Sequence, residues 1–175
     1  MKVGQGVEPL ERVNDISPPA DSYWIDLVDV KVLKESAKRE VDSQRKRLVE
    51  IAKWMYENPE LGSEEYKAYE LLTEELEKQG AKVTRGLLGL PTAFSASFKG
   101  KRKGPKIAVL AEYDALPGVG HGCGHNLIAA SAIGSGVAAA RAAKELPGEI
   151  LVVGTPAEEG RGPSAGSKVI MADKG

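Results

Sequence analysis

The sequence predicts an α/β fold in which a partly parallel β-sheet is flanked by helices. Two apolar runs, residues 107–111 and 150–154, have the composition of buried strands. Between them, residues 127–144 are rich in alanine and other small residues, which is typical of a helix packed closely on a sheet. A strand, a helix and a strand in this order form a βαβ unit with parallel strands. We expect the run 107–111 to be covered on both faces, and Pro147-Gly148 to end the helix.

A first amphipathic helix is predicted over residues 33–56. Its apolar stripe recurs at helical spacing and consists of Leu48, Ile51, Ala52 and Met55. Asn58-Pro59 follows, and proline cannot continue the helical hydrogen-bond pattern. The helix is therefore expected to end there.

A second helix is predicted to begin at Ser63, which is a suitable N-cap residue. Glu64 and Glu65 then fall in the first turn, where the helix dipole favours negative charge. Gly80 is well placed to end the helix. Its buried side is marked by Ala68, Leu71, Leu72 and Leu76.

The remaining segments are shorter. Alternation of apolar and polar residues predicts a half-buried strand around Phe94, Ala96 and Phe98. The basic, glycine-containing segment 99–106 is expected to be a solvated turn, and a short helix is expected near Ser164. Residues 1–22 contain several glycines and prolines and are expected to form a mobile tail, which leaves 23–175 as one domain.

The composition excludes several classes of function. A net charge of −1 over 175 residues gives no field that would favour nucleic acid or an anionic membrane. A single cysteine excludes an internal disulfide framework. No signal-peptide core and no apolar stretch of membrane-spanning length is present in the sequence. A cytoplasmic, soluble protein is the expectation.

Two loops that follow the predicted strands 107–111 and 150–154 concentrate the unusual residues. The first loop, 112–126, contains the only cysteine of the chain and both histidines within five residues. The second loop, 154–160, contains the adjacent carboxylates Glu158 and Glu159. Ligands of open α/β sheets bind outside the carboxyl ends of the strands. We therefore expect both loops at one rim of the sheet.

The residue types in these loops indicate a metal site. A thiolate from Cys123 and an imidazole from His125 are good ligands for zinc. Alternating glycines in the loop allow tight turns that aim neighbouring ligands at one centre. Of the paired glutamates, one could bind metal while the other moves protons for the attacking water.

A second interpretation makes Cys123 a nucleophile with His125 as its base. Side chains two residues apart rarely reach hydrogen-bond contact, whereas both can reach one ion. His121 could serve as the base instead, but no third group that would orient it is evident. The pattern therefore favours the metal site without excluding the nucleophile.

Longer motifs resemble the M20 family of metallopeptidases and amidohydrolases. The branch that the sequence resembles contains peptidase M20 domain-containing protein 2 and the aminobenzoyl-glutamate hydrolases. The resemblance rests on Asn58-Pro59-Glu60-Leu61-Gly62 with Glu64-Glu65, Leu90-Pro91-Thr92-Ala93-Phe94, Glu112-Tyr113-Asp114-Ala115-Leu116-Pro117-Gly118, Gly120-His121-Gly122-Cys123-Gly124-His125-Asn126 and Gly154-Thr155-Pro156-Ala157-Glu158-Glu159.

The resemblance implies a role for each matching residue. Cys123 and His125 match metal ligands, and Glu159 matches a further ligand. Glu158 matches the general base, and Asp114 matches the aspartate that orients a metal ligand. In addition, many members have a histidine ligand at the position of Glu112, whereas His121 matches no ligand.

The resemblance also implies that part of the enzyme is missing. The family needs further histidine ligands downstream of the paired glutamates, and this chain has no histidine after His125. We expect an incomplete, amino-terminal part of a zinc-peptidase-like catalytic domain, without the dimerisation domain. A homodimer is expected only for a complete enzyme.

The expected function is metal-dependent hydrolysis of amide bonds in small dipeptide-like or N-acyl amino acid substrates. Zinc is the expected metal, with manganese as the alternative, and two ions per site are implied for the complete enzyme. The 175-residue chain alone is expected to be inactive. The alternative is a non-catalytic remnant that binds a metal or a partner.

Overall fold

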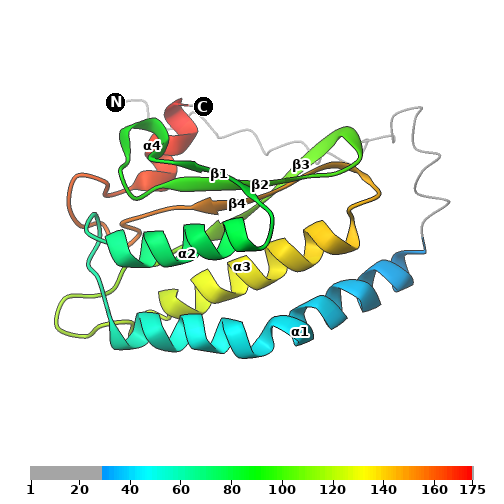
Figure 1. The fold of residues 1–175 in the computed structure, drawn as a ribbon. Helices are drawn as coiled ribbons and strands as arrows, with labels where there is room; N and C mark the ends of the chain where they lie inside the picture. Colours follow the sequence, from blue (N-terminus) through cyan, green and yellow to red (C-terminus); the bar gives the residue numbers. More distant parts are fainter. Residues whose placement is uncertain (1–28, 175) are drawn as a thin grey trace, which may run out of the picture.

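The computed structural model describes residues 29–174 and shows helices packed against a four-stranded sheet (Figure 1). The predicted tail, residues 1–22, lies outside the described residues. In chain order the elements are α1 (Val30–Glu57), α2 (Tyr66–Lys78), β1 (Lys82–Arg85), the short 3-10 helix η2 (Leu87–Gly89), β2 (Phe94–Lys99), β3 (Arg102–Ala111), α3 (His125–Ala142), β4 (Pro147–Gly154) and α4 (Ser167–Lys174).

The strands lie in the order β1-β2-β4-β3. The β1–β2 and β2–β4 pairs are antiparallel, and β3–β4 is parallel. Helix α3 connects the two parallel strands, so the predicted βαβ unit and the partly parallel sheet flanked by helices are confirmed.

The helices α1, α2 and α3 lie on one side of the sheet, and α4 lies on the other (Figure 1). The small residues of α3 allow close approach on two sides. A side chain at Gly134 would collide with Leu48 of α1, and one at Gly136 would collide with Val152 of β4. This close packing places α3 between α1 and the sheet, in the centre of the hydrophobic core.

Strand β3 differs from its prediction in two ways. Ile107 is 58% exposed and Leu110 is 47% exposed, so the expectation that residues 107–111 are covered on both faces is wrong. The reason is that β3 pairs only with β4 within the described sheet and therefore forms its edge. The basic segment 99–106 is largely strand, because β3 already begins at Arg102, although its side chains are exposed as expected.

Several predicted boundaries shift by a few residues. Helix α1 begins at Val30, where the Asp29 carboxylate accepts hydrogen bonds from the first backbone N–H groups. Helix α3 begins at His125 rather than at residue 127. Pro147-Gly148 begins β4 instead of ending the helix. The short final helix, α4, begins three residues after Ser164.

The start of α2 is built differently from the prediction. Ser63 is not the N-cap residue; the Glu60 carboxylate instead accepts hydrogen bonds from the N–H groups of Lys67 and Ala68, at 3.2 and 2.8 Å. Ser63 has a positive φ of 70°, and its hydroxyl donates to the Arg161 carbonyl and accepts from the Ser164 N–H. Ser63 therefore ties the turn before α2 to the segment after the paired glutamates.

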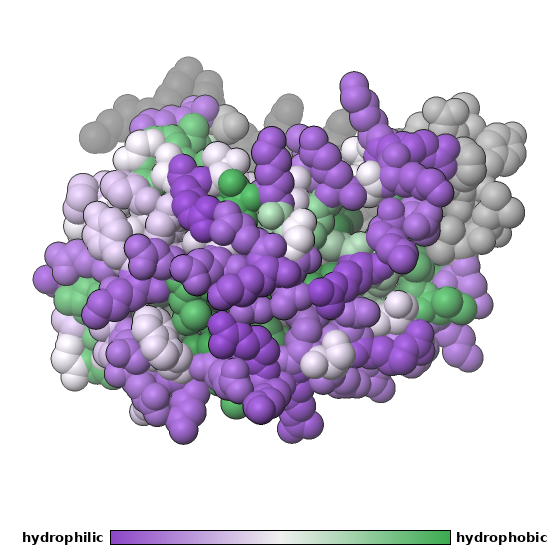
Figure 2. Space-filling model, viewed as in Figure 1, coloured by the Kyte–Doolittle hydropathy of each residue, from purple (hydrophilic) through white to green (hydrophobic). Residues whose placement is uncertain are grey.

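The surface in Figure 2 is mostly hydrophilic, with scattered hydrophobic patches over the helices and the sheet. Among residues 29–174, no helix is both long enough and apolar enough to cross a membrane.

Candidate metal centre

The two predicted loops meet at the carboxyl ends of the parallel strands β3 and β4. The Thr155 backbone N–H and hydroxyl, directly after β4, both reach the carbonyl of Ala111, the last residue of β3, at 2.9 and 3.2 Å. Because parallel neighbours end at the same rim, the segments that follow them start side by side. The sequence prediction that both loops share one rim agrees with this geometry.

Asp114 links the two loops. Its side chain is fully buried, and one carboxylate oxygen lies 2.9 Å from His125 Nδ1. The other oxygen accepts a hydrogen bond from the backbone N–H of Glu159, at 3.0 Å. Occupying Nδ1 fixes the orientation of the imidazole and leaves Nε2 as the atom that can bind an ion.

Three potential metal ligands converge beside Asp114. One ligand atom each from Cys123, His125 and Glu159 lies within 4.8 Å of the other two. Zinc binds sulfur, nitrogen and oxygen at about 2.0–2.3 Å, so small side-chain movements would let one ion contact all three. A soft thiolate, an imidazole and a carboxylate form a donor set that suits zinc.

The pKa values in this cluster follow from the Asp114–His125 contact. The hydrogen bond to Asp114 is the main cause that raises the pKa of His125. Burial alone would raise the pKa of Asp114, but hydrogen bonds from His125 and the Glu159 N–H outweigh it and lower this pKa. The aspartate therefore stays ionised and holds the imidazole in place.

Cys123 lacks the features of an activated nucleophile. Burial, together with the nearby Glu159 carboxylate, raises the pKa of its thiol. Reactive cysteines instead have a lowered pKa and an electropositive environment. Asp114 at Nδ1 would leave Nε2 of His125 free to act as a base, so this contact does not separate the two interpretations, whereas the raised pKa of the thiol does. The environment of the thiol thus favours the metal-ligand interpretation of Cys123 over the nucleophile interpretation.

Glu158 lies beside the ligand group. Its Oε2 is 3.7 Å from His125 Nε2, and its Oε1 is 3.2 Å from Nζ of Lys168 on α4. Lys168 also forms an ion pair with Glu112, which precedes Asp114 by two residues. Burial would lower the pKa of Lys168, but the contacts with Glu112 and Glu158 outweigh it and raise this pKa.

Sequence reasoning missed Lys168 and placed Glu65 in the first turn of α2 without giving it a role. Glu65 lies directly before α2 and is fully buried. It accepts hydrogen bonds from the Ala157 N–H at 2.7 Å and the Thr92 hydroxyl at 3.1 Å. Burial raises the pKa of Glu65. Ala157 has a positive φ of 53°, so this carboxylate fastens a strained residue directly before Glu158.

His121 is buried next to the cluster but is not part of the three-residue ligand group. Its Nδ1 has no hydrogen-bond partner among the described residues. Burial and the neighbouring His125 lower the pKa of His121. It is therefore expected to be neutral near pH 7.

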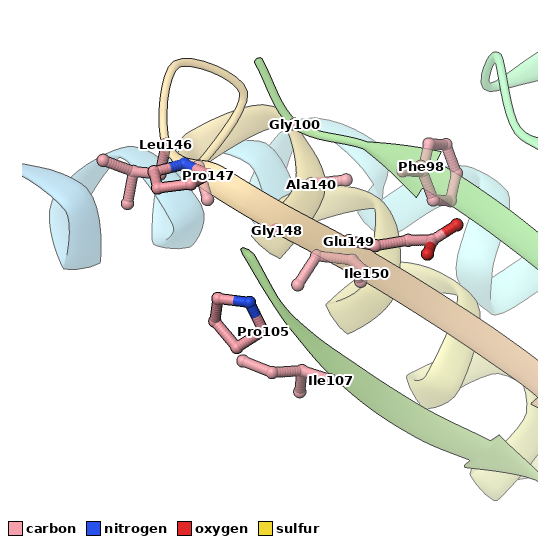
Figure 3. Close-up of a pocket in the computed structure, with 11 residues that line it drawn as sticks. Phe98, Gly100, Pro105, Ile107, Ala140, Leu146, Pro147, Gly148, Glu149 and Ile150 are labelled. Carbon is pink, nitrogen blue, oxygen red and sulfur yellow. The ribbon is translucent and has the colours of Figure 1, made fainter. Parts of the chain in front are cut away.

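A pocket at the opposite end of β3 and β4 is not the candidate site (Figure 3). Its lining is mainly apolar, from residues such as Phe98, Pro105, Ile107, Leu146 and Ile150. Its one acidic side chain, Glu149, already contacts Ser97 and Lys106. The pocket therefore lacks free groups for acid–base or metal chemistry.

A Cys–His–Glu donor group at the carboxyl ends of parallel strands combines the ligand types of a zinc site with the place where open α/β sheets bind ligands, which defines a candidate α/β metalloprotein. Residues 108–175 match the model of the peptidase family M20/M25/M40. The resemblance to the M20 family that the motifs predicted is confirmed.

Curated relatives support this assignment. The chain is 34% identical to the Xaa-Arg dipeptidase of Mus musculus over 91% of this chain and 39% of that protein. It is 36% identical to one of the subunits of p-aminobenzoyl-glutamate hydrolase from Escherichia coli, over 69% of this chain and 28% of that protein. The chain thus spans well under half of the length of these relatives.

Solved structures agree on the fold. A dinuclear metal binding peptidase of the M20 family from Bacillus subtilis superposes with a TM-score of 0.66 and 28% identity, over 76% of this chain and 40% of that chain. A putative aminohydrolase from methicillin-resistant Staphylococcus aureus gives a TM-score of 0.67 at 24% identity, over 82% and 38% of the two chains.

Proposed function

We propose that this chain supplies the first half of the active site of a metal-dependent hydrolase that cleaves amide bonds. The proposed substrates are small dipeptide-like or N-acyl amino acid compounds. Support comes from relatives named Xaa-Arg dipeptidase, p-aminobenzoyl-glutamate hydrolase and N-acetyl-L-cysteine deacetylase. The observation that carries the proposal is the convergence of Cys123, His125 and Glu159 with Glu158 beside them.

Each proposed role follows from a position in the cluster. Cys123, His125 and Glu159 are the ligands, and Asp114 orients His125 through the Nδ1 contact while holding the backbone of Glu159. Glu158 is the general base, because its carboxylate is partly exposed and stands next to the ligands without joining their group.

Zinc is the proposed metal and manganese the alternative, with two ions in the complete enzyme. A bound ion would lower the pKa of a water and polarise the carbonyl of the scissile amide. Glu158 would take one proton from the attacking water and deliver it to the leaving amine, so the base is regenerated in each cycle. Asp114 would keep the imidazole of His125 from turning during this exchange.

The 175-residue chain alone is proposed to have no meaningful amidase activity. Its described ligand group offers three donors, which is enough for one ion with open positions but too few for two. Two-metal hydrolases hold their ions about 3.5–4 Å apart, and in amide cleavage such a pair would hold both the attacking water and the carbonyl oxygen of the substrate. A homodimer is proposed only for the complete enzyme, and a cytoplasmic location stays a prediction.

The metal site is tested by native mass spectrometry of the chain after zinc loading. We expect one zinc ion per chain, and its loss when Cys123 and His125 are both replaced by alanine. A matched control replaces Ser131 and Ser135 of α3 by alanine, which leaves the cluster intact and should keep the zinc. Equal zinc content in the Cys123/His125 variant and in the wild type would reject the site.

The division of roles within the glutamate pair is tested in a complete enzyme that contains this segment. Glu158→Gln should keep the metal but lower kcat by about 10²-fold or more, which is the usual loss for a general base. Glu159→Gln should instead weaken metal binding. Suitable substrates are a dipeptide ending in arginine, aminobenzoyl-glutamate and N-acetylcysteine. The reverse behaviour of the two variants would show that their roles are exchanged.

A further inference from the structure

Three carboxylates, not one, surround the free nitrogen of His125. The nearest carboxylate oxygens of Glu112, Glu158 and Glu159 lie 3.4, 3.7 and 3.9 Å from Nε2. An ion bound at Nε2 would therefore have a choice of acidic ligands. The distances alone do not favour Glu159, which is the farthest of the three.

The three carboxylates differ in whether they form an ion pair with Lys168. Its ammonium pairs with Oε1 of Glu112 and lies 3.2 Å from Oε1 of Glu158. No lysine or arginine within residues 29–174 forms an ion pair with Glu159. The carboxylate without a cation is the one that groups with Cys123 and His125 as a potential ligand.

We propose that Lys168 is a positioning residue that decides which glutamate binds the metal ion. By pairing with Glu112 and Glu158 it keeps both out of the coordination sphere, so that Glu159 is the ligand and Glu158 stays available as a base. This inference rests on the proposed function, because it assumes that the ion binds at His125 Nε2.

The surroundings suit such a role. The Lys168 side chain is 38% exposed and that of Glu112 is 16% exposed, so solvent screens their attraction only in part. Helix α4 is held at its other end by Lys174, whose Nζ donates to the Leu88 carbonyl at 3.0 Å. Ser167, next to Lys168, is buried. The ammonium is thus presented from a fixed helix, as an oriented partner of metal-site carboxylates should be.

Removing the ammonium should change the ligand set. Without Lys168, Glu112 and Glu158 would each lose the lysine partner that they have among residues 29–174, and a divalent ion at Nε2 would attract them in its place. We therefore expect Lys168→Met to convert at least one of these glutamates into a ligand. A merely structural role for Lys168 would weaken metal binding without making it depend on them.

The test is a double-mutant cycle read by zinc affinity, with wild type, Glu158→Gln, Lys168→Met and the double variant. In the wild type, Glu158→Gln should leave the zinc Kd unchanged. In the Lys168→Met background, Glu158→Gln or Glu112→Gln should weaken binding by roughly tenfold, within the range seen for groups that support metal ligands. Lys168→Gln serves in the same cycle if Lys168→Met does not fold.

A cobalt-loaded chain gives an independent readout. Lys168→Met should weaken the visible cobalt absorption, because added carboxylate ligands raise the coordination number. Lys168→Arg, which keeps the charge, should restore the wild-type spectrum. Lys144→Met is the matched control, because it removes the same charge from an exposed position outside α4 and the cluster and should leave the spectrum unchanged.

The possible failures can be told apart. If the wild-type chain binds no zinc, both the proposed metal site and the role of Lys168 are wrong. If zinc binds but neither glutamate becomes coupled to Lys168 and the cobalt spectrum stays the same, only the inference about Lys168 is overturned.

Discussion

The two ends of the parallel pair β3–β4 are both rich in charge but differ in how the charges are held. At the amino-terminal ends, Lys101 and Glu145 form an ion pair whose side chains are 67% and 66% exposed. At the carboxyl ends, the side chains of Asp114 and His125 are 0% and 5% exposed and share partners with the neighbouring loop. Charge density is therefore a poor marker of a site, whereas buried charges with shared partners are a good one.

The physical reason is that the charged side chains at the two ends differ in their exposure to solvent. Exposed ion pairs are screened by water and salt, and many contribute nothing measurable to stability. A buried carboxylate has to be hydrogen-bonded to remain ionised, so each contact of Asp114 depends on the others. This difference predicts that substitutions at the two ends have very unequal effects.

The largest effect is expected for Asp114→Asn. The amide keeps the shape of the side chain but cannot accept from both His125 Nδ1 and the Glu159 N–H as a carboxylate does. We expect the zinc affinity of the chain to fall about 10- to 100-fold, measured by competition with a chelator. Asp173→Asn, at an exposed position of α4, is the control and should bind zinc like the wild type.

A somewhat smaller effect is expected for Glu65, which lies away from the ligands. Glu65→Ala leaves the buried Ala157 N–H without its partner, which should cost about 1–3 kcal/mol of the free energy of unfolding. Glu65→Gln can still accept that hydrogen bond and should unfold close to the wild type in urea. Equal destabilisation by both substitutions would show that the carboxylate charge, rather than the hydrogen bond, holds the loop.

The Arg47–Glu75 ion pair joins α1 and α2. It tests how burial affects an ion pair that lies outside the candidate metal centre. Glu75 is 6% exposed, and Arg47 Nε lies 2.8 Å from its carboxylate. Burial would raise the pKa of Glu75, but hydrogen bonds from Gln79 and Arg47 outweigh it, so the folded-state pKa lies below the ordinary value of 4.5. Its stabilising contribution is therefore present above about pH 4.5 and is lost as the pH falls through the folded-state pKa.

Glu75→Gln should accordingly lower the free energy of unfolding by about 1 kcal/mol near neutral pH. The difference from the wild type should shrink as the pH is lowered below 4.5, where the wild-type carboxylate becomes protonated. Urea unfolding at several pH values measures this. A difference that stays constant with pH would mean that the pair stabilises through packing alone.

The sequence predicted well which residues gather at the rim of the sheet, because these residues lie close together in the sequence. Cys123 and His125 share one glycine-rich loop, Glu158 and Glu159 are adjacent, and strand polarity brings the two loops together. The roles given to these residues and to Asp114 remain proposals. The helices and the βαβ unit were likewise predicted from periodicity and composition, with ends that shifted by a few residues.

The supporting residues could not be predicted because their partners are distant in the sequence. Glu65 meets Ala157 across 92 residues, and nothing in the first turn of a helix distinguishes a buried glutamate from an exposed one. Lys168 meets Glu112 from α4, which lies on the other side of the sheet from α3 (Figure 1). Composition also could not show that β3 is an edge strand, since the same apolar run is found in central strands.

The smallest effect is expected for Lys101→Ala, at the end opposite the candidate site. Lys101 lies 2.9 Å from Glu145 and lowers the pKa of that carboxyl, so the contact itself is well formed. Both side chains are nevertheless mostly exposed, and the entropy lost by holding them together offsets the attraction. Thermal unfolding of Lys101→Ala should therefore coincide with that of the wild type, at low and at high salt, and zinc binding should be unchanged. A clear loss of stability that disappears in high salt would show that this exposed ion pair stabilises the fold. It would contradict the conclusion that only the buried charges at the carboxyl ends contribute strongly.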